Sequence, residues 1–171
     1  MAQKPSSIRK ITLVALMAAL IFVMTVVPRI PVPATGGYIH LGDAGINFAA
    51  CAFGPVVAMA AGGLGTALAD LMGYPQWAVF SLLVHGFQGY ILGLILRNKL
   101  NAVKILLSAL FSTLIVVGGY FISGIILESP AVAVVEILPN TLQALSGSLV
   151  GLPLFLAVRK AYPPISRYSD G

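Results

Sequence analysis

The stretch of sequence that decides the fold is residues 44–72, "AGINFAACAFGPVVAMAAGGLGTALADLM". It is almost entirely apolar, and a Gly54–Pro55 pair interrupts it near the centre. Proline removes a backbone hydrogen-bond donor and glycine tolerates sharp turns, so this pair is typical of a helix break. The stretch is therefore either one long bent helix or two short helices joined by a turn. The positions of Lys and Arg elsewhere in the sequence distinguish the two possibilities.

The composition indicates the surroundings of these helices. Only 9% of the 171 residues are charged and 58% are hydrophobic, whereas a soluble domain has about 25% charged residues. So few charges cannot cover a water-facing surface, and we expect an integral membrane protein with one domain over residues 1–171. The net charge of +5 does not indicate nucleic-acid binding, because the basic residues lie at the ends of apolar runs. The single cysteine, Cys51, excludes an intrachain disulfide.

Apolar runs recur along the whole chain. They cover 11–27, 44–54, 56–72, 77–96, 105–127 and 137–158. The first run is expected to be a retained helix, because it is long for a signal peptide and no small-residue cleavage site follows it. Gly62, Gly63 and Gly65 in the third run predict close packing against other helices. Inside a bilayer every backbone polar group needs an internal partner, so the runs predict a helical bundle.

The positions of Lys and Arg decide how many times the chain crosses the membrane, since these residues mark cytoplasmic helix ends. They form three clusters: Lys4, Arg9 and Lys10; Arg97, Lys99 and Lys104; Arg159, Lys160 and Arg167. All three fall on one side only if 44–72 crosses twice. We therefore predict an all-α membrane protein, a six-transmembrane-helix bundle with cytoplasmic N- and C-termini. A long extracellular loop joins its first two helices.

That loop, 28–42, is rich in proline and glycine and cannot be helical. Ordered loops of this length commonly cover a binding site, so we expect a lid over the outer end of the bundle. The loop leads into "GGYIHLGDAG", residues 36–45, which puts His40 and Asp43 beside the second helix. Asp43 is predicted to be the N-terminal cap of that helix. His40 is predicted to face a ligand.

Polar side chains within the apolar runs mark candidate binding positions, because they are costly in a membrane. In the run 77–96 a polar stripe recurs at spacings of four, four and three, which defines one helical face. It consists of Trp77, Ser81, His85 and Gln88. The outer halves of the other runs hold Asn47, Tyr120, Asn140 and Gln143. Together these residues predict a pocket open to the outside, although Trp77 also suits an aromatic belt and His85 or Gln88 an interhelical hydrogen bond.

The sequence lacks the motifs of an enzyme. It contains no Gly-Lys pair and so no P-loop, and it has neither a zinc-type His/Glu motif nor a serine nucleophile elbow. We therefore expect no catalytic residues, no metal and no cofactor in this chain. The polar stripe favours a binder of a small, polar, largely uncharged molecule. A self-sufficient facilitator or channel, and a structural membrane subunit without a ligand, are the alternatives.

One long segment, residues 36–97, resembles a known family. It reads "GGYIHLGDAGINFAACAFGPVVAMAAGGLGTALADLMGYPQWAVFSLLVHGFQGYILGLILR". The elements "GYIHLGDA", "FGP", "GGLGTALADL" and "GYPQWA" occur in the order found in the S components of energy-coupling factor (ECF) vitamin transporters. The similarity is greatest to the hydroxymethylpyrimidine/riboflavin-like branch. Helices after residue 97 show only general similarity.

The resemblance implies a set of partners and a mechanism. S components bind a vitamin or a metal at the outer side and associate with a membrane T component and two cytoplasmic ABC-type ATPases. They are thought to topple in the membrane and so carry the site across. In the family an AxxxA pattern on the first helix faces the T component, and Ala15 and Ala19 match it. The histidine-rich N-terminal set of metal-type S components is absent, and Gln88 replaces an acidic residue common in this branch.

For the substrate, the resemblance and the residue types together favour a flat heteroaromatic B vitamin or precursor. Aromatic stacking with a few placed hydrogen bonds suits such a ring. Hydroxymethylpyrimidine and pyridoxine fit best, and riboflavin and thiamine are alternatives. The predicted contacts are His40, Asn47, Tyr74, Trp77, Ser81, His85, Gln88, Tyr120, Asn140 and Gln143. The resemblance also implies a multi-pass protein of the bacterial cell membrane.

Overall fold

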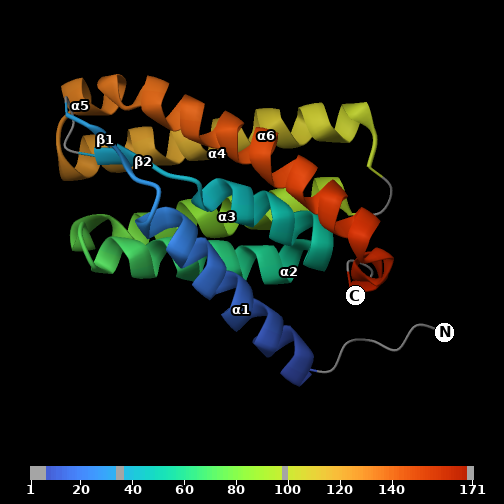
Figure 1. Ribbon diagram of the computed structural model, residues 1–171. Helices are drawn as coiled ribbons and strands as arrows, with labels where there is room; N and C mark the ends of the chain where they lie inside the picture. The colour runs from blue at the N-terminus through green and yellow to red at the C-terminus, as the bar shows by residue number, and fades with distance from the viewer. Residues whose placement is uncertain (1–6, 34–36, 98–99, 169–171) are drawn as a thin grey trace.

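A computed structural model describes residues 7–33, 37–97 and 100–168 (Figure 1). The elements are α1 (Ser7–Val26), β1 (Ile30–Val32), β2 (Gly37–Ile39), α2 (Gly42–Leu71), η1 (Pro75–Trp77), α3 (Ala78–Leu96), α4 (Ala102–Leu127), α5 (Pro130–Val135), α6 (Ile137–Ala161) and η2 (Pro163–Tyr168). Lys4, Gly36 and Lys99, which the sequence argument used, lie outside the described residues.

The described chain is an all-α membrane protein, as the sequence predicts. Five helical segments are long and apolar enough to cross a membrane. They are Ser7–Val26, Gly42–Leu71, Pro75–Leu96, Ala102–Leu127 and Pro130–Ala161. Large apolar side chains such as Leu106, Leu114 and Leu149 are exposed along these segments. In water such a surface would be unfavourable, but it is the expected boundary with lipid tails.

Helix α2 folds back on itself at Gly54. This residue has φ 78° and ψ −174°, a conformation that residues with a side chain rarely adopt. Ile46 Cγ1 lies 3.2 Å from the position that a Cβ on Gly62 would take, whereas in an unbroken helix these residues would be about 24 Å apart. The halves before and after Gly54 therefore lie side by side. Pro55 suits the first turn of the second half, where its missing N–H is not needed.

Small residues let the neighbouring helices approach α2 closely. A Cβ on Gly65 would lie 2.8 Å from the carbonyl oxygen of Ala18 in α1. A Cβ on Gly63 would lie 2.6 Å from the carbonyl oxygen of Leu82 in α3. The prediction that this glycine-rich segment serves close packing is thus confirmed. The resulting core joins α1, α2, α3 and α6, with the largest contributions from Ile21, Ile46, Leu92, Leu96 and Phe155.

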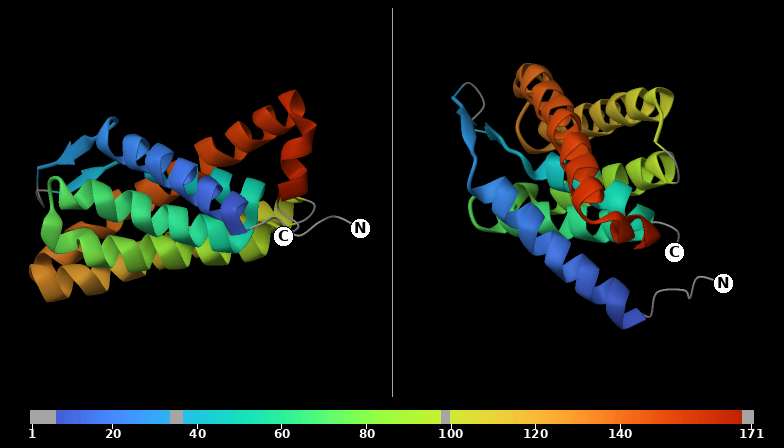
Figure 2. Two further views of the ribbon diagram at one scale, coloured as in Figure 1. Left: turned by 90° about the horizontal axis from the view of Figure 1, so that it is seen from below. Right: turned by 45° about the vertical axis from the view of Figure 1, so that its right-hand side comes forward.

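The segment before α2 is not helical, as predicted, but it contains a small β-hairpin. β1 and β2 pair antiparallel, with Ile30 opposite Ile39 and Pro31 opposite Tyr38. Figure 2 shows this hairpin at one end of the bundle, the end at which α5 also lies. We call this the hairpin end.

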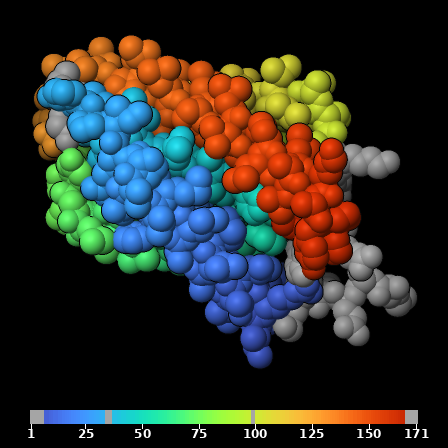
Figure 3. All heavy atoms as spheres, in the orientation of Figure 1, coloured from blue at the N-terminus to red at the C-terminus, as the bar shows by residue number. Residues whose placement is uncertain are grey.

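The opposite end collects the chain segments that the sequence assigns to the cytoplasm. The start of α1, the end of α3, the start of α4, and η2 all lie there (Figures 1 and 2). Helix α1 lies on the surface of the molecule, and its N-terminal part extends beyond its neighbours (Figure 3). Ala15 and Ala19 are both exposed on this helix.

Candidate functional site

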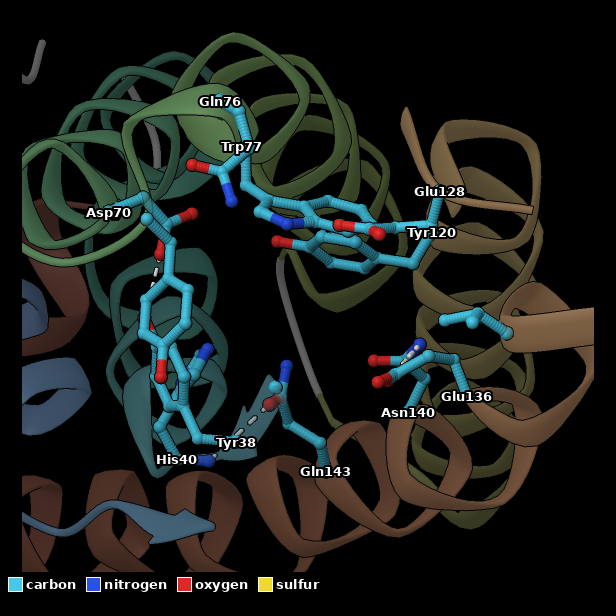
Figure 4. Close-up of a pocket in the computed structure, with 13 residues that line it drawn as sticks. Tyr38, His40, Asp70, Gln76, Trp77, Tyr120, Glu128, Glu136, Asn140 and Gln143 are labelled. Carbon is cyan, nitrogen blue, oxygen red and sulfur yellow. Dashed lines mark hydrogen bonds between the residues drawn. The ribbon is translucent and has the colours of Figure 1, made fainter. Parts of the chain in front are cut away.

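A cavity of about 260 Å³ opens at the hairpin end, among the β-hairpin, η1 and helices α4 to α6. Figure 4 shows its lining side chains around a central space. The lining residues are Gly37, Tyr38, His40, Asp70, Tyr74, Gln76, Trp77, Tyr120, Glu128, Val132, Glu136, Asn140 and Gln143. They come from the six elements β2, α2, η1, α4, α5 and α6 and from connections between elements, so the cavity exists only in the assembled fold.

Aromatic rings form two walls of this cavity. Trp77 and Tyr120 pack with ring centroids 5.9 Å apart. Tyr38 packs against Tyr74 at 5.1 Å and against His40 at 5.5 Å. Figure 4 shows the Trp77–Tyr120 pair across the space from Tyr38 and His40. Such walls favour a flat ring, because aromatic faces stack or meet edge to face at these separations.

Helix α6 contributes a polar stripe to the cavity. Glu136, Asn140 and Gln143 follow one another at spacings of four and three, which places them on one helical face. Asn140 Nδ2 donates to Glu136 Oε2 at 3.5 Å, and Gln143 Oε1 accepts from the backbone N–H of His40 at 3.4 Å. The stripe therefore joins the cavity wall to the segment that follows β2.

Asp70 holds the rim of the cavity together. The Tyr38 hydroxyl donates to Asp70 Oδ1 at 2.7 Å, and the Ser81 hydroxyl donates to Asp70 Oδ2. Ser81 is in turn hydrogen-bonded to the Tyr120 hydroxyl at 2.5 Å. Burial and the neighbouring Asp70 carboxylate raise the pKa of Tyr38, which therefore stays protonated as a donor. One carboxylate thus ties β2 to α2, α3 and α4.

A second polar layer lies behind the aromatic lining and is fully buried. His85 Nδ1 lies 3.2 Å from Asp43 Oδ1 and 2.8 Å from Gln88 Oε1. Gln88 Nε2 donates to Ser112 at 2.8 Å, and Asn47 Nδ2 donates to the carbonyl oxygen of Asp43 at 2.9 Å. Among the described residues, His85 Nε2 and both carboxylate oxygens of Asp43 have no hydrogen-bond partner. Such groups are unfavourable when buried.

The predicted contact residues therefore fall into two groups. The cavity lining brings together His40, Tyr74, Trp77, Tyr120, Asn140 and Gln143. The residues that lie behind the lining are Asn47, Ser81, His85 and Gln88, each with no exposed surface. The His85 ring is nevertheless close to the lining, with its centroid 5.7 Å from that of Tyr120.

The prediction that Asp43 caps the second helix is wrong. The N-cap of α2 is Leu41, and no side chain of that residue makes a cap hydrogen bond. Asp43 lies in the first helical turn, where its carboxylate faces His85 rather than the helix N–H groups. The imidazole of His40 takes over part of the capping role, because its Nδ1 accepts from the Gly42 N–H at 3.1 Å. Burial lowers the pKa of His40 to about 3, which keeps that nitrogen available as an acceptor.

Sequence reasoning missed several polar residues of the lining. They are Tyr38, Asp70, Gln76, Glu128 and Glu136. Three of them, Asp70, Glu128 and Glu136, are acids at or near the ends of apolar runs. Their common position near the ends of three apolar runs could have identified them as lining residues. Side chains at the same end of a helical bundle can line a cavity that opens there.

A helical membrane protein with an aromatic-walled, polar-edged cavity at one end belongs to the class of small-molecule-binding membrane subunits. The chain belongs to the ECF-type riboflavin transporter S component family, whose profile matches residues 5–160. The family resemblance predicted from residues 36–97 is thereby confirmed. The protein is a multi-pass transport protein of the plasma membrane.

Two individual proteins are similar to this chain over most of its length. An uncharacterized protein from Pyrococcus woesei is 40% identical over 143 residues, which cover 84% of this chain and 97% of the relative. The thiamine precursor transporter HmpT of Lactococcus lactis subsp. cremoris (strain MG1363) is 37% identical over 143 residues, 82% of each chain. Both alignments therefore extend far beyond the segment that carries the sequence motifs.

Proposed function

We propose that this chain is the substrate-binding subunit of an ATP-driven ECF transporter and captures a small heteroaromatic B vitamin or precursor at its outer side. Hydroxymethylpyrimidine or pyridoxine is the favoured ligand, with riboflavin and thiamine as alternatives. The observation that carries the proposal is the cavity at the hairpin end, where two aromatic walls face each other and polar groups of α6 form one edge. The chain is proposed to form a single membrane domain over residues 1–171. Its proposed function is binding, which needs no catalytic step in this chain.

The size of the cavity supports a single-ring ligand. Its volume of about 260 Å³ is near the lower end of the range of about 300–1,000 Å³ that is usual for small-molecule sites. The similarity to a thiamine precursor transporter supports the same choice.

The proposal includes a topology of six crossings with both termini in the cytoplasm. Two crossings are assigned to α2, because its halves lie side by side around Gly54. The start of α1, the end of α3 and the end of α6, which carry Arg9, Arg97 and Arg159, then all lie at the end opposite the hairpin, in agreement with the positive-inside rule. The cavity consequently opens to the outside.

Transport is proposed to require a T component and two cytoplasmic ATPases, with the subunit toppling in the membrane while docked. Ala15 and Ala19 on α1 are the proposed docking surface. Both are exposed, and the small side chains leave room for a partner helix to approach closely. Energy for uptake would come from the ATPases, since this sequence has no P-loop.

Ligand-induced thermal stabilisation of the purified chain tests the proposed function. Hydroxymethylpyrimidine, pyridoxine, thiamine and riboflavin are added separately without ATP. At a concentration 100 times the dissociation constant, a ligand should stabilise the fold by about 2.7 kcal/mol. Replacement of Trp77 by Leu, which removes one aromatic wall, should weaken that effect. Absence of stabilisation by the whole panel would refute the proposal.

Reconstitution in liposomes separates this function from its alternatives. Uptake that needs ATP, the T component and the ATPases supports the S-component function. Uptake by the chain alone would indicate a facilitator or channel. His85, Gln88 and Asn140 can also be substituted in cells. If uptake persists, the chain is a structural subunit without a ligand.

A further inference from the structure

The charged residues that line the cavity are all acidic. Asp70, Glu128 and Glu136 contribute carboxylates to its lining, and no Lys or Arg is among the lining residues. His40 adds no charge, because its Nδ1 accepts a hydrogen bond from the Gly42 N–H. Arg29 is not a lining residue, but its guanidinium lies over the rings of Tyr38 at 4.3 Å and Tyr74 at 5.9 Å and donates to backbone carbonyls.

The three carboxylates differ in how much hydrogen-bonding capacity they retain. Asp70 accepts from the hydroxyls of Tyr38 and Ser81. Glu128 is exposed at the rim, where water competes for it. Glu136 is half-buried, and among the described residues its carboxylate has one hydrogen-bond partner, Asn140, at 3.5 Å. Glu136 is therefore the carboxylate best able to accept hydrogen bonds from a ligand.

Gln143 supplies the complementary donor. Its side chain is only 2% exposed, and its Oε1 already accepts from the His40 backbone N–H. No partner for its Nε2 is found among the described residues, and Figure 4 shows this group directed into the cavity. This N–H group is therefore available to donate to an acceptor on the ligand. On α6 the donor Gln143 and the acceptor Glu136 lie two helical turns apart, with Asn140 between them.

We propose that the α6 stripe of Glu136, Asn140 and Gln143 selects a nitrogen heterocycle that carries an exocyclic amino group, in its unphosphorylated form. Gln143 donates to a ring nitrogen, and Glu136 with Asn140 accepts from the amino group. The ring itself lies between the aromatic walls. This inference rests on the proposed function and narrows its ligand class to aminopyrimidines rather than pyridoxine.

Exclusion of the phosphorylated form follows from the same charges. A phosphate group in the cavity would lie near three carboxylates and no cationic side chain of the lining. Repulsion from these carboxylates opposes a phosphate there, and no cationic side chain of the lining offsets its lost hydration. The amino group, in contrast, gains a charge-assisted hydrogen bond, which is about twice as strong as a neutral one.

The test compares three matched probes on the purified full-length chain by isothermal titration calorimetry. They are 4-amino-5-hydroxymethyl-2-methylpyrimidine, its 4-hydroxy analogue and its phosphate ester. We expect the amino compound to bind about 10- to 100-fold more tightly than the 4-hydroxy analogue, the factor typical of a hydrogen bond to a charged group. The phosphate ester should give no measurable heat.

The variant Glu136→Gln keeps the shape of the side chain and removes its charge. It should reduce the amino-over-hydroxy preference about tenfold and bind the phosphate ester measurably. Leu138→Ala, at an exposed side chain of α6 outside the cavity lining, is the control and should leave the preference unchanged. Thermal unfolding of both variants checks that each is folded.

The outcomes separate this inference from the proposed function. An unchanged preference in folded Glu136→Gln, or tight binding of the phosphate ester to the wild type, overturns the role of Glu136. Binding of pyridoxine or riboflavin without the aminopyrimidine overturns the ligand class but leaves a vitamin-binding subunit. Binding of no vitamin at all overturns the proposed function itself.

Discussion

Tyr38 shows how much a single side chain contributes to the candidate site. Its ring packs against Tyr74 and His40, its hydroxyl donates to Asp70, and the Arg29 guanidinium lies over its face. It therefore links the β-hairpin to α2 and to the segment before η1. Nothing in the sequence singled it out, because a tyrosine in a glycine-rich loop has no periodic neighbours to compare it with.

Replacement of Tyr38 by Phe removes the hydroxyl and keeps the ring. The hydrogen bond to Asp70 involves a carboxylate, and such bonds contribute about 1.5–3 kcal/mol. We expect a lower melting temperature in detergent and weaker ligand binding, since the hairpin forms part of the cavity. Tyr162→Phe, at an exposed tyrosine, is the matched control and should change neither. Equal melting temperatures for Tyr38→Phe and the wild type would show that this bond does not stabilise the fold.

The buried His40 should make the stability of the folded protein depend on pH. Burial lowers its pKa to about 3 in the folded protein, whereas an unfolded histidine titrates near 6.5. Below pH 6.5 the unfolded state binds the extra proton, so this contribution to stability falls as the pH decreases. Between pH 7.5 and 5.5 the loss is about 1.4 kcal/mol.

The variant His40→Asn isolates this contribution, because asparagine can still accept from the Gly42 N–H but does not titrate. Its melting temperature should therefore fall less than that of the wild type on acidification from pH 7.5 to 5.5. The comparison is made between the two proteins, so other titrating groups cancel. Parallel pH profiles would contradict a buried neutral His40.

At the scale of elements, the sequence predicted the fold-back of α2 but not the β-hairpin. Gly54 and Pro55 combined with the placement of Lys and Arg argued for a turn, and the Gly54 backbone adopts it. The hairpin of β1 and β2 has only three residues in each strand and includes Pro31. Strands this short have no alternation of polar and apolar residues to detect, so they remained a loop in the prediction.

The sequence predicted only part of the candidate site, again because periodicity was the main evidence. The polar stripe of α3 does share one face, but Ser81 and Gln88 use it to bind Asp70 and Ser112. The lining comes instead from helix ends and connections, where side chains such as Gln76 and Glu128 interrupt no apolar run. Periodicity identifies polar groups within a span, and it carries no information about which helix ends meet in space.

Replacement of Gly54 by Ala tests the fold-back of α2. A side chain at φ 78° and ψ −174° costs about 1–3 kcal/mol, and Gly93 packs against this turn. We expect a clear drop in melting temperature. Gly118→Ala is the control, since a Cβ there has no atom within 4 Å, and it should be neutral. Similar melting temperatures for the two variants would show that the turn does not need glycine.

At the scale of the whole molecule, the ligand cavity and the proposed docking surface lie on different parts of the fold. The cavity is at the hairpin end, between the β-hairpin and α4 to α6, whereas Ala15 and Ala19 lie on the exposed side of α1. Ligand binding and partner docking should therefore be separable by substitution.

The double variant Ala15→Leu, Ala19→Leu fills the proposed docking surface. It should abolish ATP-dependent uptake with the partner subunits and leave ligand binding to the purified chain within about twofold of the wild type. Ala157→Leu, at an exposed alanine of α6, is the control and should preserve both. Uptake at the wild-type rate by the double variant would exclude this surface as the docking site, and lost binding would indicate internal packing.

The fold-back of α2 also has a consequence for biogenesis. The half that precedes Gly54 starts at Gly42 and is only about 18 Å long, whereas the hydrocarbon core of a bilayer is about 30 Å thick. Most of its residues are buried against other helices rather than exposed to lipid. A nascent chain that ended at Phe53 should therefore leave this half uninserted, and the two halves should enter the membrane as one unit. Glycosylation mapping of truncated chains, ending before and after residue 71, would measure when insertion occurs.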